Sequence, residues 1–135
     1  TRLRDMGAEP FLLASSVVGV LAQRLVRVLC LECRTQRPLD KALAGRLRLG
    51  DDVTTAYSAE GCTACHHTGF RGRTAIYELA SFDDHIRELV HDGASEQALE
   101  NYLRQHTASI MQNGVNAIKT GQTTPEELLR VMQSV

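Results

Sequence analysis

The sequence predicts an α+β protein that is mostly helical and is interrupted by a segment with a different kind of order. Its 135 residues include three Phe, three Tyr and no Trp, so the core must consist mainly of Leu, Val, Ile and Ala. That composition suits helices better than a β-sandwich. Apolar residues recur with helical periodicity before and after residues 30–69. Within that segment the periodicity is absent, and Cys, Gly, Thr and Pro are frequent instead.

Residues 11–29 are expected to form one long helix. Apolar side chains recur there at steps of three and four, namely Leu12, Leu13, Val17, Val20, Leu21, Leu25 and Val28. Pro10 suits the first turn. The uncharged run from Pro10 to Gln23 has 14 residues, which is fewer than the roughly 18 that a membrane-spanning helix needs. We therefore expect this helix to be buried in protein.

The opening residues, TRLRDMGAEP, contain neither an apolar signal region nor an initiator Met. They predict a piece of a longer chain that stays in the reducing cytosol.

Residues 30–69 are interpreted as an insert whose order does not come from an apolar core. Within the insert, a short helix is expected between about Asp40 and Leu49, with Gly50 as its stop.

A short strand is expected at Arg73–Ala80, where RTAIYELA alternates with β-branched and aromatic residues. Four helices should follow it and form a small bundle. Ser81 is expected to cap the first helix and Ser95 the second. Gly121 should end the third, and Thr124 should cap the fourth, with Pro125 at its first helical position and Glu127 completing a capping box.

All four cysteines fall in two C-x-x-C pairs, Cys30 with Cys33 and Cys62 with Cys65, separated by 28 residues. In a reducing compartment this pattern favours a tetrahedral structural zinc site, because each tight turn can aim two sulfurs at one ion. The spacer is longer than in a common zinc ribbon, but closing a longer loop costs well under ~1 kcal/mol more. A site closed by four thiolates has no open position for water, so it is not catalytic.

Other uses of the same thiols stay open at this stage. Two disulfides or a thioredoxin-like redox pair would also use C-x-x-C, and iron accepts the same four-sulfur cage. His66 and His67 follow Cys65 directly and can substitute as ligands, although four thiols already complete the shell. No phosphate-binding loop, nucleophile elbow or H-E-x-x-H helix appears in the sequence.

Charge is uneven along the chain. Residues 1–50 hold nine Lys or Arg against four acids, whereas the whole chain has a net charge of -1. A basic front half can face phosphates or an acidic partner, or can simply be a solvated surface. A free-standing zinc ribbon that binds nucleic acid is therefore an alternative, but it would need a strongly basic surface and stacking aromatics.

Taken together, several motifs give the sequence a specific resemblance. They are MGAEPFLLASS, GVLAQRLVR, the two cysteine pairs, GFRGRTAIYE and the helical tail. With them the chain resembles, over essentially all of its length, the C-terminal part of the type II secretion ATPases, the E proteins of the general secretory pathway. The pilus-assembly ATPases of the same superfamily share the cysteine pairs and much of this order. GVLAQRLVR looks closer to the secretion branch.

The resemblance implies a RecA-like ATPase that assembles as a homohexamer at the cytoplasmic face of the bacterial inner membrane. It implies contact with inner-membrane platform proteins, no nucleic acid, and ATP with Mg²⁺ in the full-length protein. The nucleotide-binding motifs would precede Thr1, so this piece alone should not hydrolyse ATP. The matching positions make Cys30, Cys33, Cys62 and Cys65 zinc ligands. They also place Arg2, Arg4, Arg71 and Arg73 near the nucleotide.

The resemblance also suggests a division of the chain. Residues 1–29 would be the terminal helical segment of the RecA-like domain, residues 30–69 the zinc-binding module, and residues 70–135 a strand with a C-terminal helical subdomain.

Overall fold

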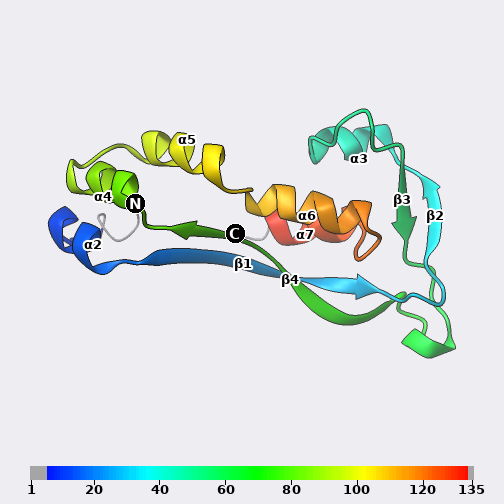
Figure 1. Cartoon of the computed structure of the whole chain (residues 1–135). Coiled ribbons are helices and arrows are strands. Elements are labelled where there is room, and N and C mark those ends of the chain that lie inside the picture. The colour runs from blue at the N-terminus through cyan, green and yellow to red at the C-terminus, as the bar shows by residue number, and fades with distance from the viewer. Residues whose placement is uncertain (1–5, 134–135) are drawn as a thin grey trace. The chain divides into compact units, whose positions relative to one another are not determined.

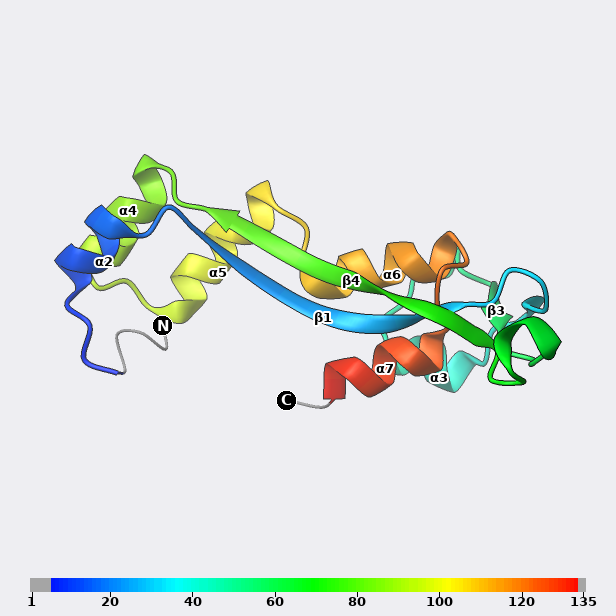
Figure 2. The same cartoon turned by 90° about the horizontal axis from the view of Figure 1, so that it is seen from below.

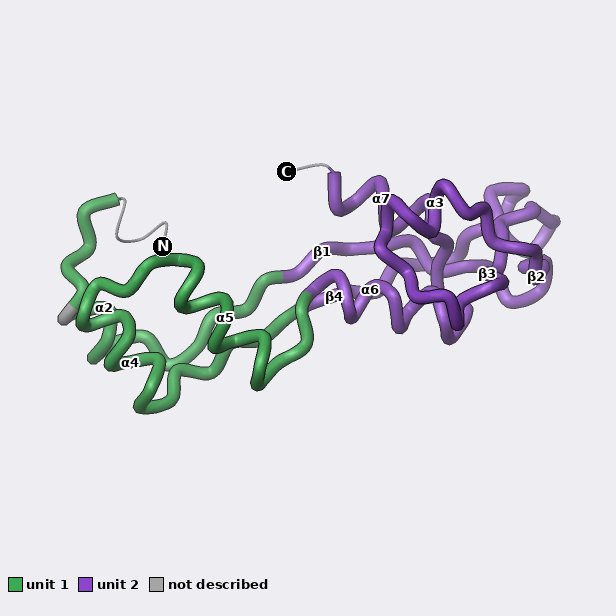
Figure 3. The backbone as a smooth tube through the Cα atoms, turned by 90° about the horizontal axis from the view of Figure 1, so that it is seen from above, with its two compact units in different colours: residues 1–22, 78–109 green, residues 23–77, 110–135 purple. Residues whose placement is uncertain are grey.

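The computed structural model describes residues 6–133, and they divide into two compact units (Figure 3). Unit 1 contains residues 6–22 and 78–109, and unit 2 contains residues 23–77 and 110–133. Each unit is thus built from two stretches that lie far apart in the sequence. The expected division at residues 29/30 and 69/70 follows the roles implied by the resemblance, and it stays a prediction.

Two long strands, β1 (Gly19–Leu29) and β4 (Phe70–Ser81), pair as a two-stranded sheet and run in opposite directions (Figure 1). The strand expected at residues 73–80 is therefore confirmed and is longer at both ends. The fold is α+β, as expected. No helix in residues 6–133 is both long enough and apolar enough to cross a membrane.

The prediction of one long helix over residues 11–29 is wrong beyond the first two turns. Helix α2 covers only Pro10–Ser16, because Val17 has an extended backbone and β1 begins at Gly19. Short apolar runs satisfy helix and strand patterns alike, and tertiary contacts decide between them. Here the Arg87 guanidinium binds the carbonyl oxygens of Ala14 and Val17 at 2.7 and 3.2 Å, which fixes the end of α2.

Unit 1 adds helices α4 (Asp84–His91) and α5 (Glu96–His106) to α2. Its buried core is small and consists of Ala14, Ile86, Val90 and Leu99. Ser95 caps α5 as predicted, with its Oγ accepting from the Ala98 N–H at 3.2 Å. The predicted cap of α4 was wrong: Asp83, rather than Ser81, accepts from the Ile86 N–H, at 2.8 Å.

Unit 2 contains a second small sheet, in which β2 (Thr35–Pro38) pairs antiparallel with β3 (Thr55–Ser58). The register sets Thr35 opposite Ser58 and Pro38 opposite Thr55. Between these strands lies α3 (Lys41–Arg46), capped by Asp40. The helix expected over residues 40–49 thus exists, but it ends before Leu47 instead of at Gly50.

Helices α6 (Ile110–Lys119) and α7 (Pro125–Gln133) complete unit 2 (Figure 2). The core of this unit combines side chains of β1, β3, β4, α6 and α7 with Leu47, and its buried residues are Val26, Leu47, Ala56, Ile76, Ala117, Ile118, Leu128 and Val131. Two of these, Leu47 and Ala56, come from the insert, so the expectation that residues 30–69 lack an apolar core was wrong in part. Because α4 and α5 belong to unit 1, the expected single bundle of four helices is not confirmed.

Candidate metal centre

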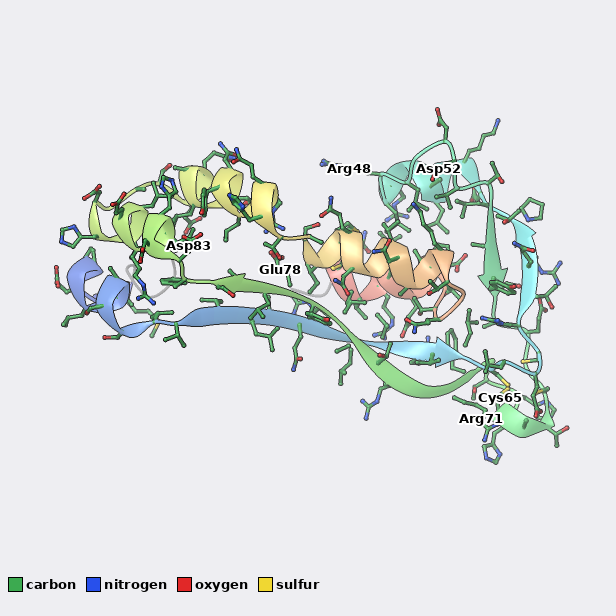
Figure 4. All side chains as sticks on the ribbon, in the orientation of Figure 1. Arg48, Asp52, Cys65, Arg71, Glu78 and Asp83 are labelled. Carbon is green, nitrogen blue, oxygen red and sulfur yellow. The ribbon has the colours of Figure 1, made fainter. Side chains whose placement is uncertain are left out.

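The four cysteines lie on two tight turns of unit 2. Cys30 directly follows β1, and Cys33 comes three residues later, before β2. Cys62 precedes the 3₁₀ turn η1 (Thr63–Cys65), which ends at Cys65. The first turn is tied to the second at the backbone, since the Cys30 N–H donates to the Gly69 carbonyl at 2.9 Å. In Figure 4 the sulfur atoms gather near the label of Cys65.

The second turn depends on backbone conformations that few residues adopt. Gly61 and Gly69 have φ angles of +106° and +83°, in the left-handed region that favours glycine. A Cβ at Gly69 would lie 2.5 Å from the Ala59 Cβ, and one at Gly61 would lie 2.9 Å from the His67 carbonyl oxygen. Both glycines therefore allow the chain to approach itself closely enough to bring the two cysteine pairs together.

The sulfur atoms lie close enough together to share one ion, and three of their distances match the edges of a tetrahedral site. All four lie within 4.8 Å of one another, and the cysteines are free. The distance is 3.8 Å from Cys30 to Cys62, 3.9 Å from Cys33 to Cys65 and 3.8 Å from Cys62 to Cys65. A tetrahedron of sulfurs at ~2.3 Å from a central ion has edges of about 3.8 Å. The donor set and its geometry therefore fit a four-thiolate metal site.

Backbone N–H groups support negative charge on two of the sulfurs. Cys65 Sγ accepts from the N–H groups of Gly69 at 3.1 Å and Cys62 at 3.2 Å, and Cys33 Sγ accepts from Gly61 at 3.4 Å. Burial disfavours the Cys65 thiolate, but these donors outweigh it and lower the pKa of Cys65 to about 6. Burial raises the pKa of Cys33 to about 12 despite its Gly61 donor. A bound cation would favour the thiolate form of every ligand.

The neighbouring histidines lie outside this cluster. His66 and His67 are exposed and have positive φ angles of 54° and 62°, so they shape the turn. Within residues 6–133, the four cysteines are the only group of three or more Cys, His, Asp or Glu side chains close enough to share an ion.

Of the four arginines expected near a nucleotide, the structure places two. Arg71 and Arg73 are exposed at the start of β4, on either side of Gly72, and Figure 4 labels Arg71. Arg2 and Arg4 lie outside the described residues. Within residues 6–133, the side chains of Arg71 and Arg73 form no ion pair or hydrogen bond.

Sequence reasoning missed a buried carboxylate that joins β1 to α7. Glu127 is 2% exposed. Its carboxylate accepts a hydrogen bond from the Arg27 backbone N–H at 2.8 Å. It also accepts hydrogen bonds from the guanidinium group of Arg27 and from that of Arg130, at 2.9–3.1 Å. Burial would raise the pKa of Glu127, but the hydrogen bonds from Arg130 and Arg27 prevail and lower it to about 2. The only sequence signal was a capping-box position.

Thr124 does cap α7 as predicted, with its Oγ1 accepting from the Glu127 N–H at 3.0 Å. The Glu127 carboxylate does not complete the predicted capping box by accepting from the Thr124 N–H, because it binds Arg27 and Arg130 instead. The loop before α7 also holds the first cysteine turn. The Leu29 N–H donates to the Gln122 carbonyl, and Arg34 Nη1 donates to the Gly121 carbonyl, both at 2.7 Å. Residues that flank Cys30 and Cys33 are therefore anchored to the C-terminal helices of unit 2.

Comparison with known proteins identifies the family of this chain. The model of the family described as "Type II/IV secretion system protein" matches residues 1–130. This chain belongs to that family. It is 49% identical over 133 residues to the type II secretion system protein E of Aeromonas hydrophila and 50% identical over 132 residues to that of Pseudomonas aeruginosa. It is 47% identical over 135 residues to the type II secretion system ATPase E of Vibrio cholerae.

Each of these alignments covers 97% of this chain but 26% of the relative. The chain therefore spans about a quarter of the length of the relatives that it matches.

Proposed function

We propose that this chain is part of the ATPase that powers type II protein secretion, and that it gives the motor a zinc-braced module. The observation that carries the proposal is the identity of 47–50% to secretion proteins E over nearly the whole chain. The tetrahedral spacing of the four sulfurs supports a structural role for the metal. The rest of the protein would bind and hydrolyse ATP with Mg²⁺, in a homohexamer at the cytoplasmic face of the inner membrane, next to the platform proteins.

In this proposal Zn²⁺ is held by Cys30, Cys33, Cys62 and Cys65. The ion would join the end of β1 to the start of β4 across an insert of 28 residues between the cysteine pairs. Four thiolates leave no position for water, so the metal would stiffen the module and take no part in hydrolysis. The backbone donors to Cys65 and Cys33 fit this role, because such hydrogen bonds stabilise thiolate ligands and fix their orientation.

Arg71 and Arg73 would contact the nucleotide, as would Arg2 and Arg4. Exposed guanidinium groups with no partner among residues 6–133 can bind phosphate oxygens in a bidentate manner. This role is supported by the exposure of Arg71 and Arg73 beside Gly72, whose positive φ of 77° and open surroundings leave room for close approach.

The first experiment measures metal and ATP turnover on the full-length protein. We expect one zinc per chain and ATP hydrolysis, and we expect Cys62→Ser to lower the zinc content severalfold. His66→Asn is the matched control, because Asn tolerates the left-handed backbone at that exposed position. Zinc content that is unchanged in Cys62→Ser would refute the site. A full-length protein with no ATP turnover would refute the motor.

A second experiment tests the arginines in the same protein. Arg71→Ala and Arg73→Ala should each lower kcat/KM for ATP by about tenfold or more, because an interaction with the transferring phosphate is lost. Arg46→Ala, an exposed arginine at the end of α3, is the control and should stay within about twofold of the wild type. Equal values for all three variants would remove Arg71 and Arg73 from the site.

A further inference from the structure

In unit 2 a short segment leads from the metal centre to the two exposed arginines. Cys65 is the last of the four cysteines, and β4, which carries Arg71 and Arg73, begins at Phe70. Residues 66–70 are all that separate Cys65 from Arg71, and Figure 4 labels these two side chains at the same end of unit 2. The bonds made by this segment therefore decide how firmly the arginines are tied to the metal centre.

Gly69 uses both of its backbone groups to bind the cysteine turns. Its N–H donates to Cys65 Sγ at 3.1 Å, and its carbonyl oxygen accepts from the Cys30 N–H at 2.9 Å. Its φ angle of +83° lies in the left-handed region, and a Cβ added there would lie 2.5 Å from the Ala59 Cβ. The backbone that enters β4 is thus fixed by the same two turns that hold the sulfur atoms.

Thr68 adds a side-chain bridge next to Gly69. Its Oγ1 donates to the Cys65 carbonyl oxygen at 2.7 Å or to the Phe70 carbonyl oxygen at 2.9 Å, and it accepts from the Phe70 N–H at 3.2 Å. One hydroxyl group therefore joins the backbone of a metal ligand to the first residue of β4. The Phe70 ring is held as well, because the Arg27 guanidinium carbon lies over it, 4.2 Å from its centroid.

The arginines themselves lie on a stretch of chain with little support of its own. Residues 71–73 are all exposed, and Gly72 has a φ angle of +77° and open space around it. The first buried residue of β4 is Ile76, which belongs to the core of unit 2. Arg71 and Arg73 are thus suspended between two anchors, the core at Ile76 and the bonds of Thr68 and Gly69. Because glycine permits a wide range of backbone angles, a shift at either anchor will redirect both guanidinium groups.

We propose that Thr68 is a positioning residue that transmits the state of the metal centre to Arg71 and Arg73, so that metal binding and the binding of nucleotide phosphates are coupled. The inference rests on the proposed function, since it takes these arginines as phosphate-binding groups. Two ligands that favour the same conformation of a shared segment raise each other's affinity by the same factor. The nucleotide should therefore slow the loss of the metal, and an intact hydroxyl at Thr68 should strengthen the binding of the nucleotide.

Nucleotide binding by the full-length protein tests the role of Thr68. Thr68→Val removes the hydroxyl and keeps the branched shape, whereas Thr68→Ser keeps the hydroxyl. We expect Thr68→Val to raise the Kd of a fluorescent ATP analogue about fivefold or more while one zinc per chain is retained. Thr68→Ser should bind within about twofold of the wild type. Thr63→Val, which makes the same change at an exposed position of η1, is the control and should leave the Kd unchanged.

The rate of zinc loss gives a second readout that does not depend on catalysis. A chelating dye follows the release of zinc from the full-length protein with and without a non-hydrolysable ATP analogue. The analogue should slow release about fivefold in the wild type and in Thr63→Val, but less than twofold in Thr68→Val. A Thr68 that only stabilised the fold would change the rate by the same factor with and without the analogue.

The outcomes separate this inference from the proposed function. A Kd for Thr68→Val equal to that of the Thr63→Val control, or zinc release that the analogue does not slow, would overturn the coupling. So would loss of zinc from Thr68→Val, because the hydroxyl would then serve only the metal turn. Arg71→Ala and Arg73→Ala are measured in the same binding assay. If they weaken binding and Thr68→Val does not, only the coupling fails; if they bind like the wild type, the role of the arginines fails with it.

Discussion

Unit 1 and unit 2 both have small apolar cores, but they differ in the interactions that supplement these cores. Unit 2 combines an apolar core with a buried carboxylate between two arginines and a cluster of four cysteine sulfurs. Unit 1 buries four apolar residues, leaves a cavity beneath its sheet and exposes leucines on the other face. Small domains need such cross-links or a partner surface. Unit 2 therefore has cross-links that reinforce its own core, whereas unit 1 has a smaller core and more exposed apolar side chains.

Metal removal should give the largest effect and should affect only unit 2. A structural zinc contributes on the order of 10 kcal/mol to the folding of its site. We expect a strong chelator to raise amide exchange at residues 55–70 by at least a hundredfold, while exchange in α4 and α5 stays within about threefold. Hydrogen exchange by mass spectrometry on the full-length protein measures both. A uniform rise across the two units would break the comparison.

Loss of the Glu127 carboxylate should be the next largest effect. Glu127→Ala removes every acceptor that joins α7 to Arg27 and leaves the part-buried Arg27 N–H without this partner. We expect the free energy of unfolding of unit 2 to fall by about 3 kcal/mol. Chemical denaturation followed by the exchange of α7 amides measures it. Glu126→Ala, at the exposed neighbouring position, should cost less than ~0.5 kcal/mol, and equal losses would contradict the assigned role.

Lowering the pH should weaken the same interaction by protonating the Glu127 carboxylate. The pKa of Glu127 is lowered from 4.5 to about 2 in the folded protein, so the unfolded chain binds the proton more readily. Its contribution is fully present above about pH 4.5 and is lost as the pH falls toward 2, by about 3 kcal/mol in all. The wild type should therefore lose more stability than Glu127→Gln between pH 5 and pH 3. Parallel pH profiles of the two proteins would disprove this.

The smallest effect concerns the helix caps of unit 1. Ser95→Ala removes the acceptor for the Ala98 N–H and should cost about 1 kcal/mol. Ser81→Ala should be nearly neutral, because Asp83 occupies the capping position of α4. Thermal unfolding of the two variants tests this directly. A larger loss from Ser81 than from Ser95 would favour the cap expected from the sequence over the one in the structure.

The sequence predicted what depends on local chemistry. The four C-terminal helices, the caps at Ser95 and Thr124 and the convergence of the cysteines follow from short motifs whose partners lie within a few residues or on one ion. It could not predict β1, because GVLAQRLVRVL is compatible with a helix until β4 pairs with it. Nor could it predict that Glu127 binds Arg27, a partner 100 positions away. The roles of Arg71 and Arg73 stay predictions.

The bond between Arg27 and Glu127 also has a consequence for biosynthesis. A ribosome makes the β1 strand about a hundred codons before the helix that satisfies its backbone. Unit 2 is therefore incomplete until synthesis reaches α7. A stop codon ahead of Pro125 would leave unit 2 permanently unfinished, even with every cysteine in place.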